Sequence, residues 1–195
     1  KLSEIKKQDV QRLHLAIGDK SGIYAANRVL SLLHGVFARA SDWGWDGGNP
    51  VAGVKKFKEQ SRERFIEADE LPRFFEALSQ EANITIRDYF LLSILTGARR
   101  ANMMAMKWSE VNLDRALWTI PHQKTKTANT YQVPLVAEAV AILKQRKSTS
   151  TSEWVFASKS KTGHLVEPKG AWKRLLDRAG LENLRLHDLR RSLGS

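Results

Sequence analysis

The chain has 195 residues, 42% of them hydrophobic, and a formal net charge of +11, a composition that supports a packed core and is unlike that of a disordered chain. No stretch approaches the roughly 18 consecutive apolar residues of a membrane-spanning helix. The chain has no cysteine, which excludes disulfides and thiolate metal sites and fits a reducing compartment, and its five histidines have no metal-ligand spacing. We therefore expect no metal site and no membrane association.

The first third of the chain predicts a small helical bundle. Apolar residues at positions 29, 30, 33, 36, 37 and 40 have the period of an amphipathic helix over residues 27–40, and residues 1–26 show a weaker helical pattern. A turn cluster follows at 44–50. Residues 55–66 are mostly charged and lack an apolar stripe, which indicates a linker.

The rest of the chain predicts helices around a hairpin. A helix follows Asp69 and Glu70, with a buried face of Leu71, Phe74, Phe75 and Leu78, and further helices are expected over 84–96 and 100–107. Two β-rich stretches, 116–121 and 130–135, flank a polar turn at 122–129. Helices are expected again over 136–147 and 168–179, with Gly180 as the stop, and from His187 onward.

The positive charge is distributed along the whole chain. Residues 1–66 carry 12 basic and 7 acidic groups, and residues 67–195 carry 20 and 14. Such a distribution suits a DNA duplex that is contacted from more than one side. A solvated basic surface explains the charge equally well.

Four residues have the chemistry that a DNA phosphodiester requires: Arg99, Lys126, His187 and Arg190. Two guanidiniums bind the non-bridging oxygens, a lysine on a turn donates a proton to the leaving oxygen, and a histidine moves the proton of a nucleophile. His187 and Arg190 are spaced i, i+3, on one helix face. Each residue alone has an ordinary structural explanation, so only the combination is informative. The lack of a carboxylate cluster argues against a metal-dependent nuclease.

The combination resembles the tyrosine recombinases, or phage-type integrases, of prophages and genomic islands. The resemblance rests on Thr96-Gly97-Ala98-Arg99, on Lys126 eight residues before Pro134, and on His187-Asp188-Leu189-Arg190. The stretches 101–108 and 190–195 also resemble this family. Lys124 competes for the lysine role, but Lys126 alone matches the spacing to Pro134.

The resemblance implies a mainly α fold with a small antiparallel β-sheet, built from a helical core-DNA-binding domain at 1–56, a linker at 57–67 and a mixed α/β catalytic domain at 68–195. It implies that Arg99 and Arg190 bind the scissile phosphate, that Lys126 is the general acid and that His187 is the acid/base. The implied activity is site-specific recombination of a mobile element through a 3′-phosphotyrosine, without cofactor. The implied partners are double-stranded attachment-site DNA and three further copies in a tetramer, in the bacterial cytoplasm at the nucleoid.

The chain departs from the family pattern at three places. The family's nucleophilic tyrosine follows the His-x-x-Arg helix, whereas Tyr24, Tyr89 and Tyr131 all precede it, so we expect no nucleophile in this chain and a catalytic domain that lacks its last segment. Asn102 stands where many members have an acid. The arm-binding domain is absent, and we expect the core-binding domain to be incomplete at its start.

Other DNA contacts are predicted at basic residues off the apolar stripes or in the linker: Arg28, Arg39, Lys55, Lys56, Lys58, Arg62 and Arg64. A solvated-face role is an equal alternative for each. Two further interpretations stay open for the whole chain. The first is a DNA-binding fragment without catalysis, and the missing tyrosine favours this interpretation. The second is a basic RNA-binding module, for which the sequence has no signature motif.

Overall fold

The computed structural model describes residues 1–125 and 129–192. The chain divides into two compact units, Lys1–Arg62 and Glu63–Ser195, and each unit has its own hydrophobic core. The division lies within the segment 57–67 that we predicted to be the linker. Among the described residues, no helix is long and apolar enough to cross a membrane.

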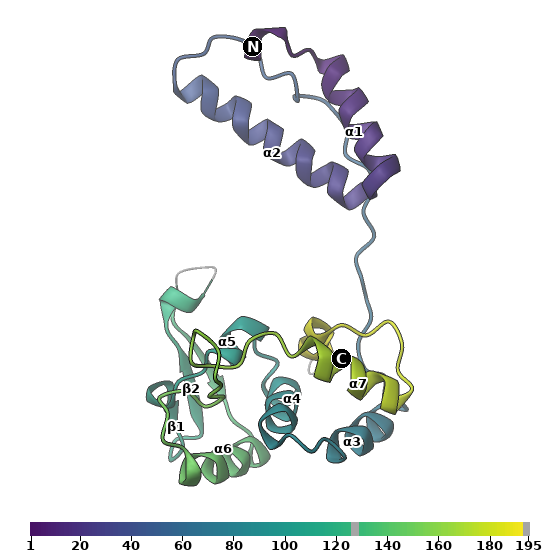
Figure 1. Cartoon of the computed structure of the whole chain (residues 1–195). Helices are drawn as coiled ribbons and strands as arrows, with labels where there is room; N and C mark the ends of the chain where they lie inside the picture. The colour runs from purple at the N-terminus through teal and green to yellow at the C-terminus, as the bar shows by residue number, and fades with distance from the viewer. Residues whose placement is uncertain (126–128, 193–195) are drawn as a thin grey trace. The chain divides into compact units, whose positions relative to one another are not determined.

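The first unit is a helical hairpin. A short 3-10 turn (Leu2–Glu4) precedes α1 (Lys7–Ser21) and α2 (Ile23–Asp42), which pack side by side (Figure 1). Gly22 makes the turn between them with a φ of 89°, a conformation that side chains with a Cβ rarely adopt. The predicted helix at 27–40 is the middle of α2, and its apolar stripe forms a small core with Val10 and Val51.

A polar network binds the start of the predicted linker to this hairpin. The buried side chain of Asn27 accepts the N–H of Phe57 at 2.9 Å and donates to the Phe57 carbonyl at 2.9 Å and to Glu59 at 2.7 Å. The Phe57 ring also stacks on His14, with 4.4 Å between centroids. Residues 57–59 therefore belong to the first unit. Periodicity missed this because one amide and one ring hold the segment, with no apolar stripe.

The second unit is mostly helical and has a small sheet at one side (Figure 1). Its helices are α3 (Leu71–Ser79), α4 (Ile84–Thr96), α5 (Arg100–Met104), α6 (Ala137–Thr149), α7 (Lys169–Ala179) and α8 (Leu189–Ser192). The strands β1 (Val111–Asn112), β2 (Leu117–Ile120) and β3 (Tyr131–Pro134) form an antiparallel sheet in the order β1-β2-β3. Short 3-10 turns occupy Trp108–Glu110, His122–Lys124 and Leu186–Asp188. The mainly α fold with a small antiparallel sheet is confirmed.

Three details of the second unit differ from the sequence expectations. The sheet has a third strand, β1, which is only two residues long and too short to show a pattern. The helix expected at 100–107 ends at Met104. Phe75, which we expected on the buried face of α3, is 41% exposed, and Ala77 is buried there instead.

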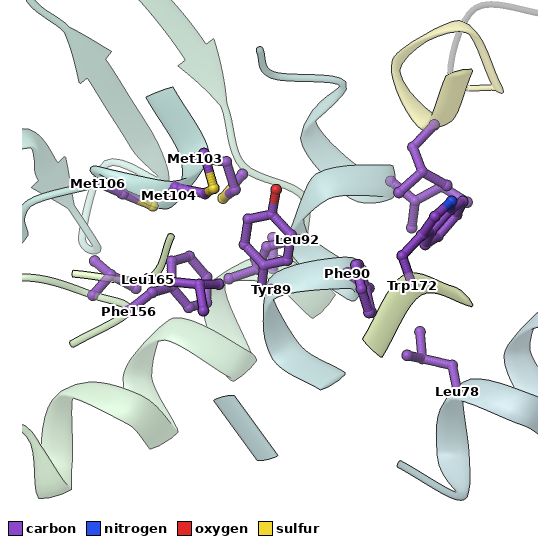
Figure 2. Close-up of a cluster of buried hydrophobic side chains, with 14 of the residues drawn as sticks. Leu78, Tyr89, Phe90, Leu92, Met103, Met104, Met106, Phe156, Leu165 and Trp172 are labelled. Atoms are coloured by element: carbon purple, nitrogen blue, oxygen red, sulfur yellow. The ribbon is translucent and has the colours of Figure 1, made fainter. Parts of the chain in front are cut away.

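Helix α4 lies at the centre of the second unit. It contacts α3, α5, α6 and α8, and it buries side chains around its whole circumference, among them Tyr89, Phe90 and Leu92 (Figure 2). A helix that is apolar all round is one enclosed by other elements. Because α4 is fixed on all sides, the turn at its C-terminus is presented from a rigid support.

Candidate active site

Arg99 stands in a tight turn between α4 and α5. The Thr96 hydroxyl donates to the Leu92 carbonyl at 2.6 Å and accepts the N–H of Ala98 at 3.3 Å. Gly97 ends α4 in the left-handed region with a φ of 56°, where glycine carries no steric penalty. Arg99 then precedes the first turn of α5 in an extended conformation. The sequence Thr-Gly-Ala-Arg thus builds a turn that directs the chain at Arg99 away from α4.

His187 and Arg190 are placed by the buried residues between them. The carboxylate of Asp188, which is 2% exposed, accepts the N–H of Arg185 at 2.9 Å and so caps the 3-10 turn. Leu189 is buried in the core. With Asp188 and Leu189 turned inward, His187 and Arg190 are both exposed, as the i, i+3 spacing predicts.

Arg99 and Arg190 line the same pocket, although they are far apart in the sequence. The pocket has a volume of about 300 Å³. Neither guanidinium forms a hydrogen bond or an ion pair with the rest of the described chain. The walls come from the α4–α5 turn, from α5, from both arms of the β2–β3 hairpin and from α8, and the lining residues are Thr96, Gly97, Ala98, Arg99, Asn102, Ile120, Thr125, Asn129, Thr130, Tyr131 and Arg190. Two exposed cations in one concave site form a receptor for an anion.

Lys126 lies outside the described residues, but the two arms of its hairpin are described. The Thr125 hydroxyl donates to the Asn129 carbonyl at 2.8 Å, which joins the two described arms. Its competitor Lys124 has intramolecular partners: its ammonium nitrogen lies 2.5 Å from Glu110 and 2.6 Å from the carbonyl oxygen of Ala105. Lys124 is therefore held against the body of the unit, which argues against a role in proton transfer.

Tyr131 and Asn102 also line this pocket, and neither was predicted as a site residue. Tyr131, the first residue of β3, is 57% exposed and lines the same pocket as the two arginines. Asn102 on α5 is only 6% exposed, and its neutral amide adds no negative charge beside Arg99. Tyr131 lies in the second arm of the hairpin without a motif of its own, so only the folded hairpin reveals its position.

The predicted DNA-contact residues fall into two groups. Exposed side chains on the first unit are those of Arg28, Arg39, Lys55, Lys56 and Lys58. Arg62 is half-buried and has an interaction within the chain. Arg64 forms a two-point ion pair with Glu70, at 2.6 and 2.7 Å, which holds the pKa of Glu70 below its usual value. The charge of Arg64 is therefore paired with Glu70 inside the second unit, whereas the lysines of the first group are exposed.

A larger pocket of the second unit, about 740 Å³, lies elsewhere, between α4, α6 and the segment after α6. Its charged residues are paired: Arg146 lies 3.0 Å from the buried carboxylate of Asp88 and donates to the Val155 carbonyl at 2.9 Å. These contacts tie α6 to α4 and to the segment after α6. The smaller arginine pocket is the better candidate site, because its cations are free to bind a ligand.

The chain belongs to the phage integrase family, whose match extends over residues 64–195. The resemblance noted at Arg99, Lys126 and the His187–Arg190 segment is thereby confirmed at the level of the family. Among curated relatives, the chain is 33% identical to the prophage integrase IntF of Escherichia coli K12 over 135 residues, which cover 67% of this chain and 28% of that protein. It is 27% identical to the integrase of Salmonella phage P22, over 81% of this chain and 42% of that protein. The chain thus spans less than half the length of these two relatives.

Solved structures show the same fold. A lambda integrase dimer bound to a COC′ core site matches 97% of this chain and 72% of that chain, with a TM-score of 0.76 and 21% identity. The Tn1549 transposon integrase in complex with a circular intermediate DNA matches the same shares, with a TM-score of 0.81 and 12% identity. At these identities the likeness establishes the architecture.

Proposed function

We propose that this chain supplies the DNA-binding and phosphate-binding part of a site-specific recombinase that integrates or excises a mobile element. The observation that carries the proposal is the shared pocket of Arg99 and Arg190, two exposed guanidiniums without ion-pair partners in the described chain. Membership of the phage integrase family supports the same proposal.

In the proposed reaction, Arg99 and Arg190 bind the non-bridging oxygens of one phosphate. Their hydrogen bonds strengthen as negative charge builds up in the transition state, which lowers the barrier. A tyrosine hydroxyl attacks the phosphorus, the bond to the 5′-oxygen breaks, and Lys126 protonates that oxygen as the general acid. His187, on the same short segment as Arg190, acts as the acid/base that takes the proton of the attacking tyrosine hydroxyl. The 3′-phosphotyrosine bond then conserves the energy of the cut bond for rejoining.

The nucleophile of this reaction is proposed to be a tyrosine other than those of this chain. Tyr89 is fully buried, and burial raises its pKa to about 12. Tyr24 lies in the first unit, where its hydroxyl donates to the carbonyl of Gln60. Tyr131 shares the pocket with the arginines and is the one described tyrosine that a direct test has to exclude. Without a nucleophile, the chain alone binds a phosphodiester and leaves it uncut.

The proposed partner is duplex DNA carrying attachment sites, in the cytoplasm of a bacterium. Exposed lysines and arginines on the first unit would contact the phosphate backbone away from the reactive pocket. A tetramer on paired sites is proposed by analogy with a lambda integrase tetramer that was solved on a Holliday junction.

The test is a nicked suicide substrate incubated with the whole protein. We expect a covalent protein–DNA adduct, and a reduction of its formation rate by at least about 100-fold in Arg99→Gln and in Arg190→Gln. Arg115→Gln, which removes an exposed arginine from the β1–β2 turn, is the matched control and should leave the rate unchanged. Tyr131→Phe should still form the adduct. If the wild-type protein forms none, the enzyme proposal is wrong and a DNA-binding role remains.

A further inference from the structure

Tyr89 carries a buried hydroxyl that has no hydrogen-bond partner of acceptable geometry in the described chain. Burial raises the pKa of Tyr89, and the nearby Ser93 hydroxyl, which acts to lower that pKa, donates to the Tyr89 backbone carbonyl at 2.7 Å. The Tyr89 side chain is 0% exposed and packs among Phe90, Leu92 and Phe156 in the core (Figure 2). Its hydroxyl is the one buried side-chain polar atom of the described residues for which no hydrogen-bond partner is found. Such a group costs free energy unless an ordered water or another ligand pairs with it.

A small cavity lies at this residue. It has a volume of about 10 Å³, which is the order of space that one water molecule requires. The polar or charged residues that line it are Tyr89, Ser93, Arg100, His187 and Arg190. An empty cavity of this size is usually apolar, whereas a polar one holds water.

We propose that this cavity binds one ordered water, which accepts a hydrogen bond from the Tyr89 hydroxyl and connects the buried phenol to the segment of His187 and Arg190. Tyr89 is then a positioning residue for those two side chains. The functional consequence rests on the role proposed above for His187 and Arg190.

Two features join the cavity to the reactive pocket. Ala98 and Arg190 line both of them, so the water site lies directly behind the wall that carries one of the two phosphate-binding arginines. Helices α4 and α8 are also in contact, so Tyr89 and Arg190 belong to elements that pack together. Because burial raises the pKa of Tyr89 to about 12, the phenol keeps its proton and remains a donor at neutral pH.

The physical effect would be to restrict the segment of His187 and Arg190. Both side chains are exposed, and Arg190 has no ion pair with the described chain to hold it. A water that is hydrogen-bonded to a rigid core residue and to this segment gives the segment a fixed point on its inner side. The rate of a reaction that depends on the geometry of Arg190 would then depend on Tyr89 as well.

Crystal structures of the wild-type chain and of Tyr89→Phe, together with denaturant unfolding, test the water site without any DNA. We expect a water peak in the wild-type cavity, its loss in the variant, and a lower unfolding midpoint for the variant. Tyr24→Phe, which removes one direct hydrogen bond to Gln60, calibrates that loss. A dry wild-type cavity with a raised midpoint for Tyr89→Phe would overturn the proposal, because removal of a truly unpaired hydroxyl stabilises a core.

The positioning role is tested in the whole protein on the suicide substrate. We expect Tyr89→Phe to reduce the rate of adduct formation at saturating protein by roughly two- to tenfold, the value of one hydrogen bond, with an unchanged Kd for the duplex. An unchanged rate would overturn the positioning role. If even the wild-type protein forms no adduct, the proposed function fails, and the crystal and unfolding results still decide whether the water site exists.

Discussion

The ammonium nitrogen of Lys124 lies 2.5 Å from a carboxylate oxygen of Glu110, whose side chain is 10% exposed. Lys124 also donates to the carbonyl oxygen of Ala105, which directly follows α5. The leading arm of the β2–β3 hairpin is thereby attached to the helix that begins after Arg99. This contact fixes the position of Lys124 near the end of the described leading arm.

The first prediction is that Lys124→Gln destabilises the second unit by about 1–3 kcal/mol, because the variant leaves the carboxylate of Glu110 without its charged partner. Urea unfolding of the chain measures the change. Lys173→Gln is the control: its partner Asp177 is 65% exposed and 3.6 Å away, so the loss should stay below about 1 kcal/mol. Equal losses of unfolding free energy in the two variants would show that the Lys124–Glu110 pair stabilises the unit no more than an exposed ion pair does.

The second prediction concerns pH and the Arg64–Glu70 pair. The hydrogen bond from Arg64 lowers the pKa of Glu70 below its usual value of 4.5, so the folded state binds this proton more weakly than the unfolded state does. The pair therefore stabilises the fold above about pH 4.5, and its contribution is lost as the pH falls through the lowered pKa.

Glu70→Gln should accordingly be less stable than the wild type at neutral pH, and the difference should shrink as the pH falls below about 4.5. Unfolding curves over this pH range provide the measurement. Glu153→Gln, which removes a mostly exposed carboxylate, is the control and should show little pH-dependent difference. A difference for Glu70→Gln that is constant with pH would contradict the ion-pair explanation.

A third prediction separates DNA contacts from structural cations. If Lys55, Lys56 and Lys58 contact DNA phosphates, each lysine-to-glutamine change should reduce the slope of log Kd against log salt by about one. Fluorescence anisotropy with a labelled duplex gives this slope. Arg64→Gln should instead lower the unfolding free energy and leave the slope unchanged, because its charge is already paired with Glu70. Identical slopes for the wild type and the lysine variants would remove these residues from the interface.

The fourth prediction is a DNA contact by Tyr131, whose exposed phenol lines the arginine pocket. Tyr131→Phe should weaken binding of the duplex by roughly two- to tenfold, which corresponds to the loss of one hydrogen bond to a phosphate. Tyr24→Phe, in the first unit, serves as the control and should retain the wild-type Kd. Unchanged binding by Tyr131→Phe would show that the phenol lines the pocket without contacting DNA.

Much of the fold could be predicted from local pattern. The stripe at 29–40 indicated α2, the range expected over 84–96 matches α4, Gly180 indicated where α7 ends, and two β-rich stretches indicated the hairpin. Two of the misses have a common cause. β1 is two residues long, and residues 57–59 are held by Asn27 and His14, so neither feature leaves a periodic signal.

The sequence by itself determined which side chains could bind a phosphate. Arg99 follows its turn motif, and the spacing of His187 and Arg190 puts them on one face, because these are properties of single elements. Which cations are available was decided by the tertiary structure alone. Arg99 and Arg190 meet at one pocket, whereas Arg64 and Lys124 are paired with Glu70 and Glu110. Whether a basic side chain forms an ion pair depends on which elements pack against each other. The spacing of residues along one helix or strand does not determine that packing.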